Sequence, residues 1–101
     1  MFYPTISCSK ARLMIRQGAQ LVDVRTPQEY ACGALPGAVN LPLQWVAGAH
    51  EHLDQERPVI VYCRSGQRSE MARMILASIG FSNVWNIGGY GEHQPCLAAN
   101  S

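Results

Sequence analysis

The chain has 101 residues, 48% of them hydrophobic, so it is long enough to bury one core and too short for two. Its formal net charge of +1 excludes the strongly basic surface by which proteins bind nucleic acids or anionic membranes. We therefore expect a single domain over residues 1–101 that binds neither of these partners. Any attraction for an anion must come from a local cluster of positive groups.

The cysteines are far apart in the sequence and form no Cys-x-x-Cys pair, so neither a structural zinc site nor a redox dithiol is indicated. Free thiols are typical of a reducing compartment, and the first residues lack the pattern of a signal peptide. No apolar run has the length of a membrane span. We expect a soluble cytoplasmic protein without a metal or other cofactor. The four cysteines are Cys8, Cys32, Cys63 and Cys96.

The first helix signal lies near the N-terminus. Ser7 and Ser9 are of a residue type that caps helices, and the pattern after them predicts a helix over about residues 10–17. Leu13 and Met14 are expected to face the core from this helix. The two tryptophans of the chain are likewise expected to anchor the core: Trp45 and Trp85.

Two strands and a short helix are predicted next. An apolar run over residues 20–24 indicates a buried strand. Thr26 and Glu29 then form a capping box with a proline between them, which predicts the start of a short helix. Residues 38–41 indicate a second strand, which Pro42 ends.

The second half of the chain repeats this alternation. Residues 43–55 predict one or two short helices, residues 58–62 a central strand, residues 68–79 a long helix and residues 84–87 a last strand. Strands that alternate with helices at such short spacing indicate an α/β domain with a mostly parallel sheet. The apolar residues at helical spacing in the long helix, expected to face the core, are Met71, Met74, Ile75 and Ile79.

Cys63 directly follows the central strand, and the long helix begins a few residues later. Ligands of such sheets bind beyond the carboxyl ends of the strands, where Asp23, Cys63 and the pair Gly88–Gly89 are all expected. Inward-facing N–H groups of a short loop, together with a helix N-terminus, stabilise an anion. A thiol there should ionise readily, and the thiolate is the reactive form of cysteine. The alternative for Cys63 is a buried, inert side chain.

Arginines give the loop after Cys63 a local positive charge. Arg64 and Arg68 are expected to bind an anionic substrate and to lower the pKa of the thiol. For Arg68 the alternative is an ion pair with Asp23 or Glu29 that braces the loop.

The other loop residues are expected to act mainly through their backbone. Gly66 is expected to have a positive φ angle that turns N–H groups inward. Ser65, Gln67 and Ser69 contribute further N–H groups. For the Ser69 side chain we consider two roles, which are a hydrogen bond to the sulfur and a cap on the helix.

Four segments together resemble one family, the single-domain rhodanese sulfurtransferases. They are LVDVRTPQEY at residues 21–30, GALPGAVNLP at 33–42, CRSGQRS at 63–69 and GG at 88–89. The resemblance implies a five-stranded parallel sheet flanked by helices, and a cysteine, here Cys63, that carries sulfur as a persulfide. It also implies that Asp23 and Arg25 support the site without reacting. We expect Arg25 to form a structural ion pair with Glu29.

The implied reaction has two halves. The Cys63 thiolate attacks the outer sulfur of an anionic donor such as thiosulfate, sulfite leaves, and an acceptor such as cyanide or a thiol then removes the sulfur. A partner protein in a sulfur relay is an alternative acceptor. The chain departs from the family pattern at Ala34, where histidine is frequent, and around His93, where an aromatic residue is usual. These departures concern substrate preference and local packing more than the type of reaction.

Two other functions compete with this interpretation. Phosphatases and arsenate reductases with a similar cysteine loop have five residues between cysteine and arginine, whereas four separate Cys63 from Arg68. The smaller loop favours a sulfur atom over a phosphate. Rhodanese-like modules that only bind partners usually lack the cysteine. Cys32 is the one candidate for a resolving thiol, and a metal role is disfavoured for His50 and His52 with His93 and Cys96.

Overall fold

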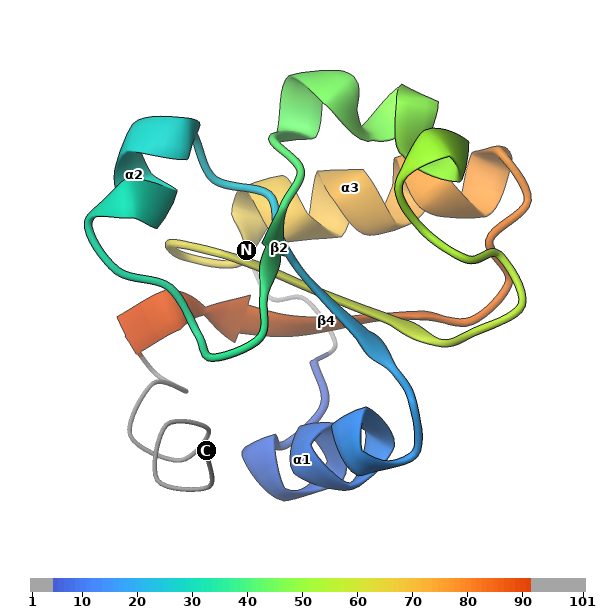
Figure 1. Ribbon diagram of the computed structural model, residues 1–101, viewed down its shortest axis with the longest axis horizontal. Helices are drawn as coiled ribbons and strands as arrows, with labels where there is room; N and C mark the ends of the chain where they lie inside the picture. The colour runs from blue at the N-terminus through green and yellow to red at the C-terminus, as the bar shows by residue number, and fades with distance from the viewer. Residues whose placement is uncertain (1–4, 92–101) are drawn as a thin grey trace.

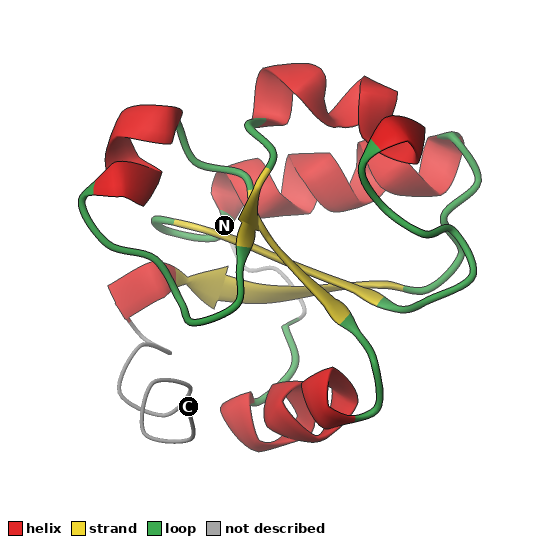
Figure 2. Ribbon diagram, viewed as in Figure 1, coloured by secondary structure: helices red, strands yellow, loops and turns green. Residues whose placement is uncertain are grey.

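The computed structural model describes residues 5–91 as an α/β domain of three layers, with a parallel sheet between helices. Figure 2 shows the strands crossing the middle of the molecule with helices on either side. This confirms the predicted fold class. The strands are β1 (Gln20–Asp23), β2 (Val39–Asn40), β3 (Val59–Cys63) and β4 (Val84–Gly89), in the parallel order β2-β1-β3-β4.

The helices cover both faces of the sheet. Helix α1 lies on one face, and α3 and the 3-10 helix η1 lie together on the other (Figure 1). Helix α2 follows the carboxyl end of β1. The bounds of these helices are α1 Cys8–Arg16, α2 Pro27–Ala31, η1 Leu43–Glu51 and α3 Gln67–Ser78.

The expected fifth strand is wrong for the residues described, where the sheet has four strands. The segment before α1 does lie beside β4, because the Ile6 N–H donates to the Asn86 carbonyl at 3.1 Å. Within residues 5–91 this is the one backbone hydrogen bond found between that segment and β4, and the chain turns into α1 after Ser7. The Ser7 hydroxyl accepts from the Lys10 N–H at 3.1 Å and caps the helix.

Alternation of side chains along β3 divides the core into two parts. Val61 and Cys63 pack on the side of α3 and η1, and Ile60 and Tyr62 pack on the side of α1. All five residues of β3 are buried. The cysteine is therefore held at the end of a fully buried strand, directly under the start of α3.

The capping box predicted at the start of the short helix is present. The Glu29 N–H donates to Thr26 Oγ1 at 3.2 Å, and the Thr26 N–H donates to Glu29 Oε1 at 3.0 Å. These reciprocal bonds satisfy two backbone donors that the first turn of a helix otherwise leaves unpaired. They fix the entry of α2 and hold the Glu29 carboxylate near the carboxyl end of β1.

Several side chains expected in the core are exposed instead. Met71 and Met74 are 55% and 60% exposed, and Trp45 and Leu13 are 59% and 52% exposed. In α3 the inward face passes through Ser69, then Ala72 and Leu76, because Ser69 is buried against the cysteine loop and sets the rotation of the helix. This places Met71 and Met74 on the outer side.

The cysteines differ in state. Cys63 is free and buried, and Cys32 is free and exposed at the end of α2. Cys8 is disulfide-bonded, so the expectation that it is a free thiol is wrong. This cysteine therefore does not support a reducing compartment. Cys96 lies outside the described residues.

Within residues 5–91 no helix is long and apolar enough to cross a membrane. The cytoplasmic location and the single domain over residues 1–101 stay predictions.

Candidate active site

The loop after β3 wraps backbone N–H groups around the sulfur of Cys63. The Gly66 N–H donates to Cys63 Sγ at 3.0 Å. Gly66 has φ 98°, as predicted, and is the N-cap residue of α3. A β-carbon at this position would lie 3.3 Å from the Gly88 Cα, so glycine also allows β4 to approach closely.

The surroundings of Cys63 lower the pKa of its thiol. Burial acts in the opposite direction and is the largest single influence, because it disfavours the charged form. The Ser69 hydroxyl, 3.5 Å from Sγ, and the N–H groups of Ser69, Ser65 and Gly66 together outweigh it. The lowered pKa agrees with the prediction, although the hydroxyl contributes more than the sequence suggested.

The two arginines of the loop have different environments. Arg64 is exposed, and among residues 5–91 no hydrogen bond or ion pair of its side chain is found. Arg68 donates to both carboxylate oxygens of Glu29 at 2.7 and 3.0 Å. This is one of the two partners considered for Arg68 in its bracing role. The pKa of Arg68 is raised first by its hydrogen bonds to Glu29, and the Coulomb attraction of Cys63 also raises it, so the Arg68 charge still interacts with Cys63.

The expected ion pair between Arg25 and Glu29 is wrong. Arg25 pairs with Asp23 instead, and its Nη2 lies 2.6 Å from Asp23 Oδ2 in a buried contact. Asp23 is only two residues earlier in the chain, so its carboxylate is within reach of the Arg25 side chain. Glu29 is already bound by Thr26 and Arg68.

Asp23 and Arg25 support the end of the sheet through two tyrosines. Tyr62 donates from its hydroxyl to Asp23 Oδ2 at 2.8 Å. The Arg25 guanidinium lies over the Tyr90 ring, 4.5 Å from its centroid, and donates to the Gly33 carbonyl at 2.6 Å. These contacts rigidify the carboxyl end of β1 next to β3. The supporting role that the family resemblance implies for Asp23 and Arg25 stays a prediction.

Asn86 in β4 was missed by the sequence analysis, which treated it only as part of a strand. Its side chain is bonded to the cysteine loop: the Ser69 hydroxyl lies 2.8 Å from Asn86 Oδ1, and Asn86 Nδ2 donates to the Gly66 carbonyl at 3.2 Å. A polar residue in a buried strand is the signal that could have found it, because buried polar groups are hydrogen-bonded.

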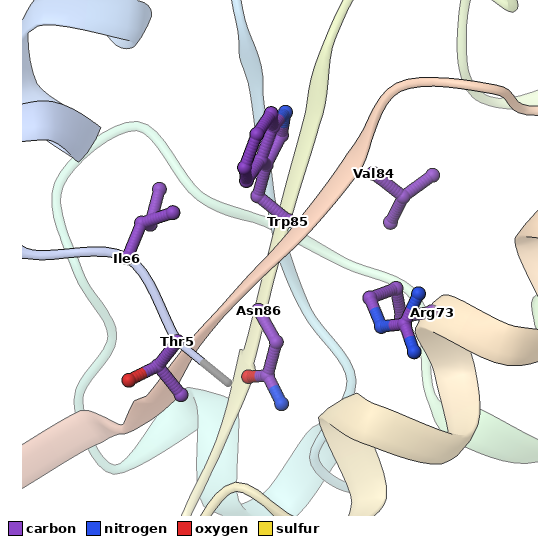
Figure 3. Close-up of a pocket in the computed structure, with 6 residues that line it drawn as sticks. All are labelled: Thr5, Ile6, Arg73, Val84, Trp85 and Asn86. Carbon is purple, nitrogen blue, oxygen red and sulfur yellow. The ribbon is translucent and has the colours of Figure 1, made fainter. Parts of the chain in front are cut away.

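Two pockets lie near this loop. One, of about 290 Å³, opens at the outer edge of β4 beside Asn86 (Figure 3), and its lining residues are Thr5, Ile6, Arg73, Val84, Trp85 and Asn86. A second, of about 250 Å³, lies between the end of β1, the start of η1 and Arg68. Its lining residues are Val24, Thr26, Pro42, Leu43, Gln44 and Arg68.

The remaining predicted positions lie around the loop or outside the described residues. Ser65 and Gln67 are exposed, with Gln67 as the first residue of α3. Ala34 is partly buried after α2, and His93 lies outside the described residues. Within residues 5–91 no group of three or more His, Cys, Asp or Glu side chains could hold a metal ion.

In this α/β domain a buried strand ends at a thiol that accepts a backbone N–H at the start of a helix, a setting that favours the thiolate. Residues 7–94 match the family described as Rhodanese-like domain. The thiosulfate sulfurtransferase GlpE of Pseudomonas entomophila is 38% identical over 87 residues, which are 86% of this chain and 80% of that protein. The chain therefore belongs to the rhodanese family of sulfurtransferases, as its motifs predicted.

Solved structures agree with this assignment. The human single-domain sulfurtransferase TSTD1 superposes with a TM-score of 0.78 at 26% identity, covering 91% of this chain and 95% of that one. A structure described as a rhodanese with anions from E. coli superposes with a TM-score of 0.68 at 35% identity, over 74% of this chain and 91% of that one.

Proposed function

We propose that this protein is a thiosulfate sulfurtransferase that carries sulfur as a persulfide on Cys63. The observation that carries the proposal is the position of Cys63 Sγ, which accepts the Gly66 N–H at 3.0 Å inside the loop that starts α3. The lowered pKa of this thiol favours the thiolate, the form that attacks sulfur. The naming of the Pseudomonas relative as a thiosulfate sulfurtransferase supports the choice of donor.

The first half-reaction loads the sulfur. The Cys63 thiolate attacks the outer sulfur of thiosulfate and forms a new S–S bond. The S–S bond of thiosulfate breaks, and its electron pair leaves with sulfite. Cys63 then carries a persulfide anion, which the same N–H groups that hold the thiolate can stabilise.

The second half-reaction removes the sulfur. Cyanide or a thiolate attacks the outer sulfur of the persulfide, and the electron pair of the broken S–S bond returns to Cys63 as thiolate. A thiolate acceptor leaves with a persulfide of its own, which fits a small thiol or a partner protein in a sulfur relay. The pocket beside Arg68 gives such an acceptor an approach next to the loop.

The two loop arginines have separate roles in this proposal. Arg64 is exposed beside Cys63 and meets the anionic donor. Arg68 holds the loop through Glu29 and adds positive potential at the sulfur. Ser65, Gln67 and Ser69 bring N–H groups toward the donor, and Gly66 supplies the turn that aims them.

Steady-state turnover of thiosulfate and cyanide tests this function. The parent protein should form thiocyanate with ping-pong kinetics, and Cys63→Ser should reduce the rate to background. Cys32→Ser is the matched control, since Cys32 is the other free cysteine of the described residues and is exposed at the end of α2. Turnover that survives in Cys63→Ser would contradict the proposal. Loss of turnover in Cys32→Ser would show that Cys32 takes part.

A further inference from the structure

The Asn86 side chain joins β4 to the cysteine loop through its amide nitrogen and its amide oxygen. Its Nδ2 donates to the Gly66 carbonyl at 3.2 Å and to Glu70 Oε1 at 3.3 Å, and its Oδ1 accepts the Gly88 N–H at 2.8 Å. A carbonyl and a carboxylate only accept, and a backbone N–H only donates, so these partners fix the orientation of the amide. Its oxygen therefore faces the Ser69 hydroxyl.

The Ser69 hydroxyl has one proton and three acceptors within reach. Asn86 Oδ1 lies at 2.8 Å, the Gly66 carbonyl at 3.1 Å and Cys63 Sγ at 3.5 Å. While Cys63 is a neutral thiol, the proton lies toward Asn86, the nearest acceptor, and the thiol can donate to the Ser69 oxygen. Once Cys63 is a thiolate, the sulfur becomes the stronger acceptor and attracts the hydroxyl proton.

We infer that Asn86 is a positioning residue, which holds the Ser69 hydroxyl while Cys63 is neutral and releases it to the sulfur when Cys63 is an anion. The release leaves no buried group unpaired, because Asn86 Oδ1 keeps the Gly88 N–H. This inference rests on the proposed function in taking the Cys63 anion as the reactive form.

Most charged groups around this cluster are paired with one another, whereas Arg64 is exposed to solvent. The charged pairs that face the loop from α3, α2 and the end of β1 are Glu70 with Arg73, Glu29 with Arg68, and Asp23 with Arg25.

Asn86→Asp tests the competition for the proton. The variant keeps the size of the side chain but loses the donor to the Gly66 carbonyl and Glu70, and its carboxylate holds the Ser69 proton more strongly than an amide oxygen does. We expect alkylation of Cys63 by iodoacetamide, measured below the pKa of the parent thiol, to be about tenfold slower, which corresponds to one pKa unit. The comparison uses folded protein, as judged by circular dichroism.

The same substitution in Ser69→Ala separates the hydroxyl from a direct effect of charge. Ser69→Ala has no proton to share, so adding Asn86→Asp should change the alkylation rate by much less than it does in the parent. An unchanged rate in Asn86→Asp, or an equal slowing in both backgrounds, would overturn the inference.

A second measurement needs no change at Asn86. In the parent protein, the NMR shift of the Gly88 amide should follow the titration of Cys63, because Gly88 becomes the one remaining donor to Asn86 Oδ1 among the contacts described. The response should vanish in Ser69→Ala, and its persistence there would contradict the inference. The first experiment measures the alkylation rate of Cys63 and the second its titration, so neither depends on turnover. A protein that behaves as expected here but takes no sulfur from thiosulfate would refute the proposed function alone.

Discussion

Arg68 and Glu29 join the reactive loop to α2 through two parallel hydrogen bonds of 2.7 and 3.0 Å. Such a two-point contact between guanidinium and carboxylate fixes the orientation of both groups. Because Glu29 is itself held by the capping box of α2, the loop is attached to a fixed helix end. The pair accounts for Arg68 as a bracing residue and leaves Arg64 as the loop arginine that faces solvent.

The first prediction separates the two arginines. Arg64→Ala should lower kcat/KM for thiosulfate about tenfold with little change in the midpoint of thermal unfolding, because it removes a charge-assisted contact to the donor. Arg68→Ala should lower the unfolding midpoint, because it breaks the pair with Glu29. Arg16→Ala, an exposed arginine at the end of α1, is the control. Equal kcat/KM in Arg64→Ala and the parent would refute the role of Arg64.

The second prediction concerns stability in acid. The hydrogen bond from Arg68 is the main cause that lowers the pKa of Glu29 from its usual 4.5 to about 2. A carboxyl with a depressed pKa in the folded state stabilises that state above its usual pKa, and the contribution is lost as the pH falls from about 4.5 toward 2. The free energy of unfolding should therefore fall more steeply in this window for the parent than for Glu29→Gln.

Urea unfolding at several pH values measures this difference. We expect it to be about 1 kcal/mol, because the pair is partly exposed to solvent. Glu56→Gln, in an exposed turn, is the matched control for the loss of one carboxylate. Parallel curves for the parent and Glu29→Gln would contradict the prediction.

The third prediction concerns Tyr62, the buried residue that precedes Cys63 in β3. Tyr62→Phe removes a buried hydroxyl that accepts the Leu35 N–H at 3.0 Å and donates to Asp23 at 2.8 Å. Because both partners lose a buried hydrogen bond, the free energy of unfolding should fall by about 1–3 kcal/mol. Tyr30→Phe, which loses one partly buried bond to a carbonyl, should cost less. Urea unfolding at neutral pH compares the two variants, and an equal or smaller loss in Tyr62→Phe would count against the prediction.

The fourth prediction follows from the length of the loop. Four residues separate Cys63 from Arg68, and this ring of N–H groups is too small to place a phosphoryl group in line with the sulfur. Hydrolysis of p-nitrophenyl phosphate should stay near background and be equal in the parent and in Cys63→Ser. A Cys63-dependent phosphatase activity comparable with sulfur transfer would refute the argument from size.

Local signals in the sequence predicted the parts of the fold that depend on few neighbours. Thr26 and Glu29 specify the start of α2 by themselves, and the β-branched run before Cys63 specifies a buried strand. The conformation of the loop after Cys63 could be predicted as well, because a strand end, a glycine with positive φ and a helix start leave the chain little freedom there.

Tertiary contacts decided what the sequence could not predict. Helical spacing favoured Met71 as a core residue, but the burial of Ser69 against Cys63 rotates α3 away from that arrangement. Arg25 had two carboxylates nearby in the sequence, and only the fold shows that Glu29 is taken by Arg68. Asn86 lies 17 residues from Ser69, so no local pattern connects the two.

The gain of sulfur by the intact protein tests the central claim most directly. After incubation with thiosulfate, mass spectrometry should show the parent protein heavier by one sulfur atom, and cyanide should return it to its original mass. Cys63→Ser should gain nothing under the same conditions, whereas Cys32→Ser should gain one sulfur as the parent does. A parent protein that gains no sulfur, or a Cys63→Ser variant that gains one and loses it to cyanide, would contradict sulfur transfer through Cys63.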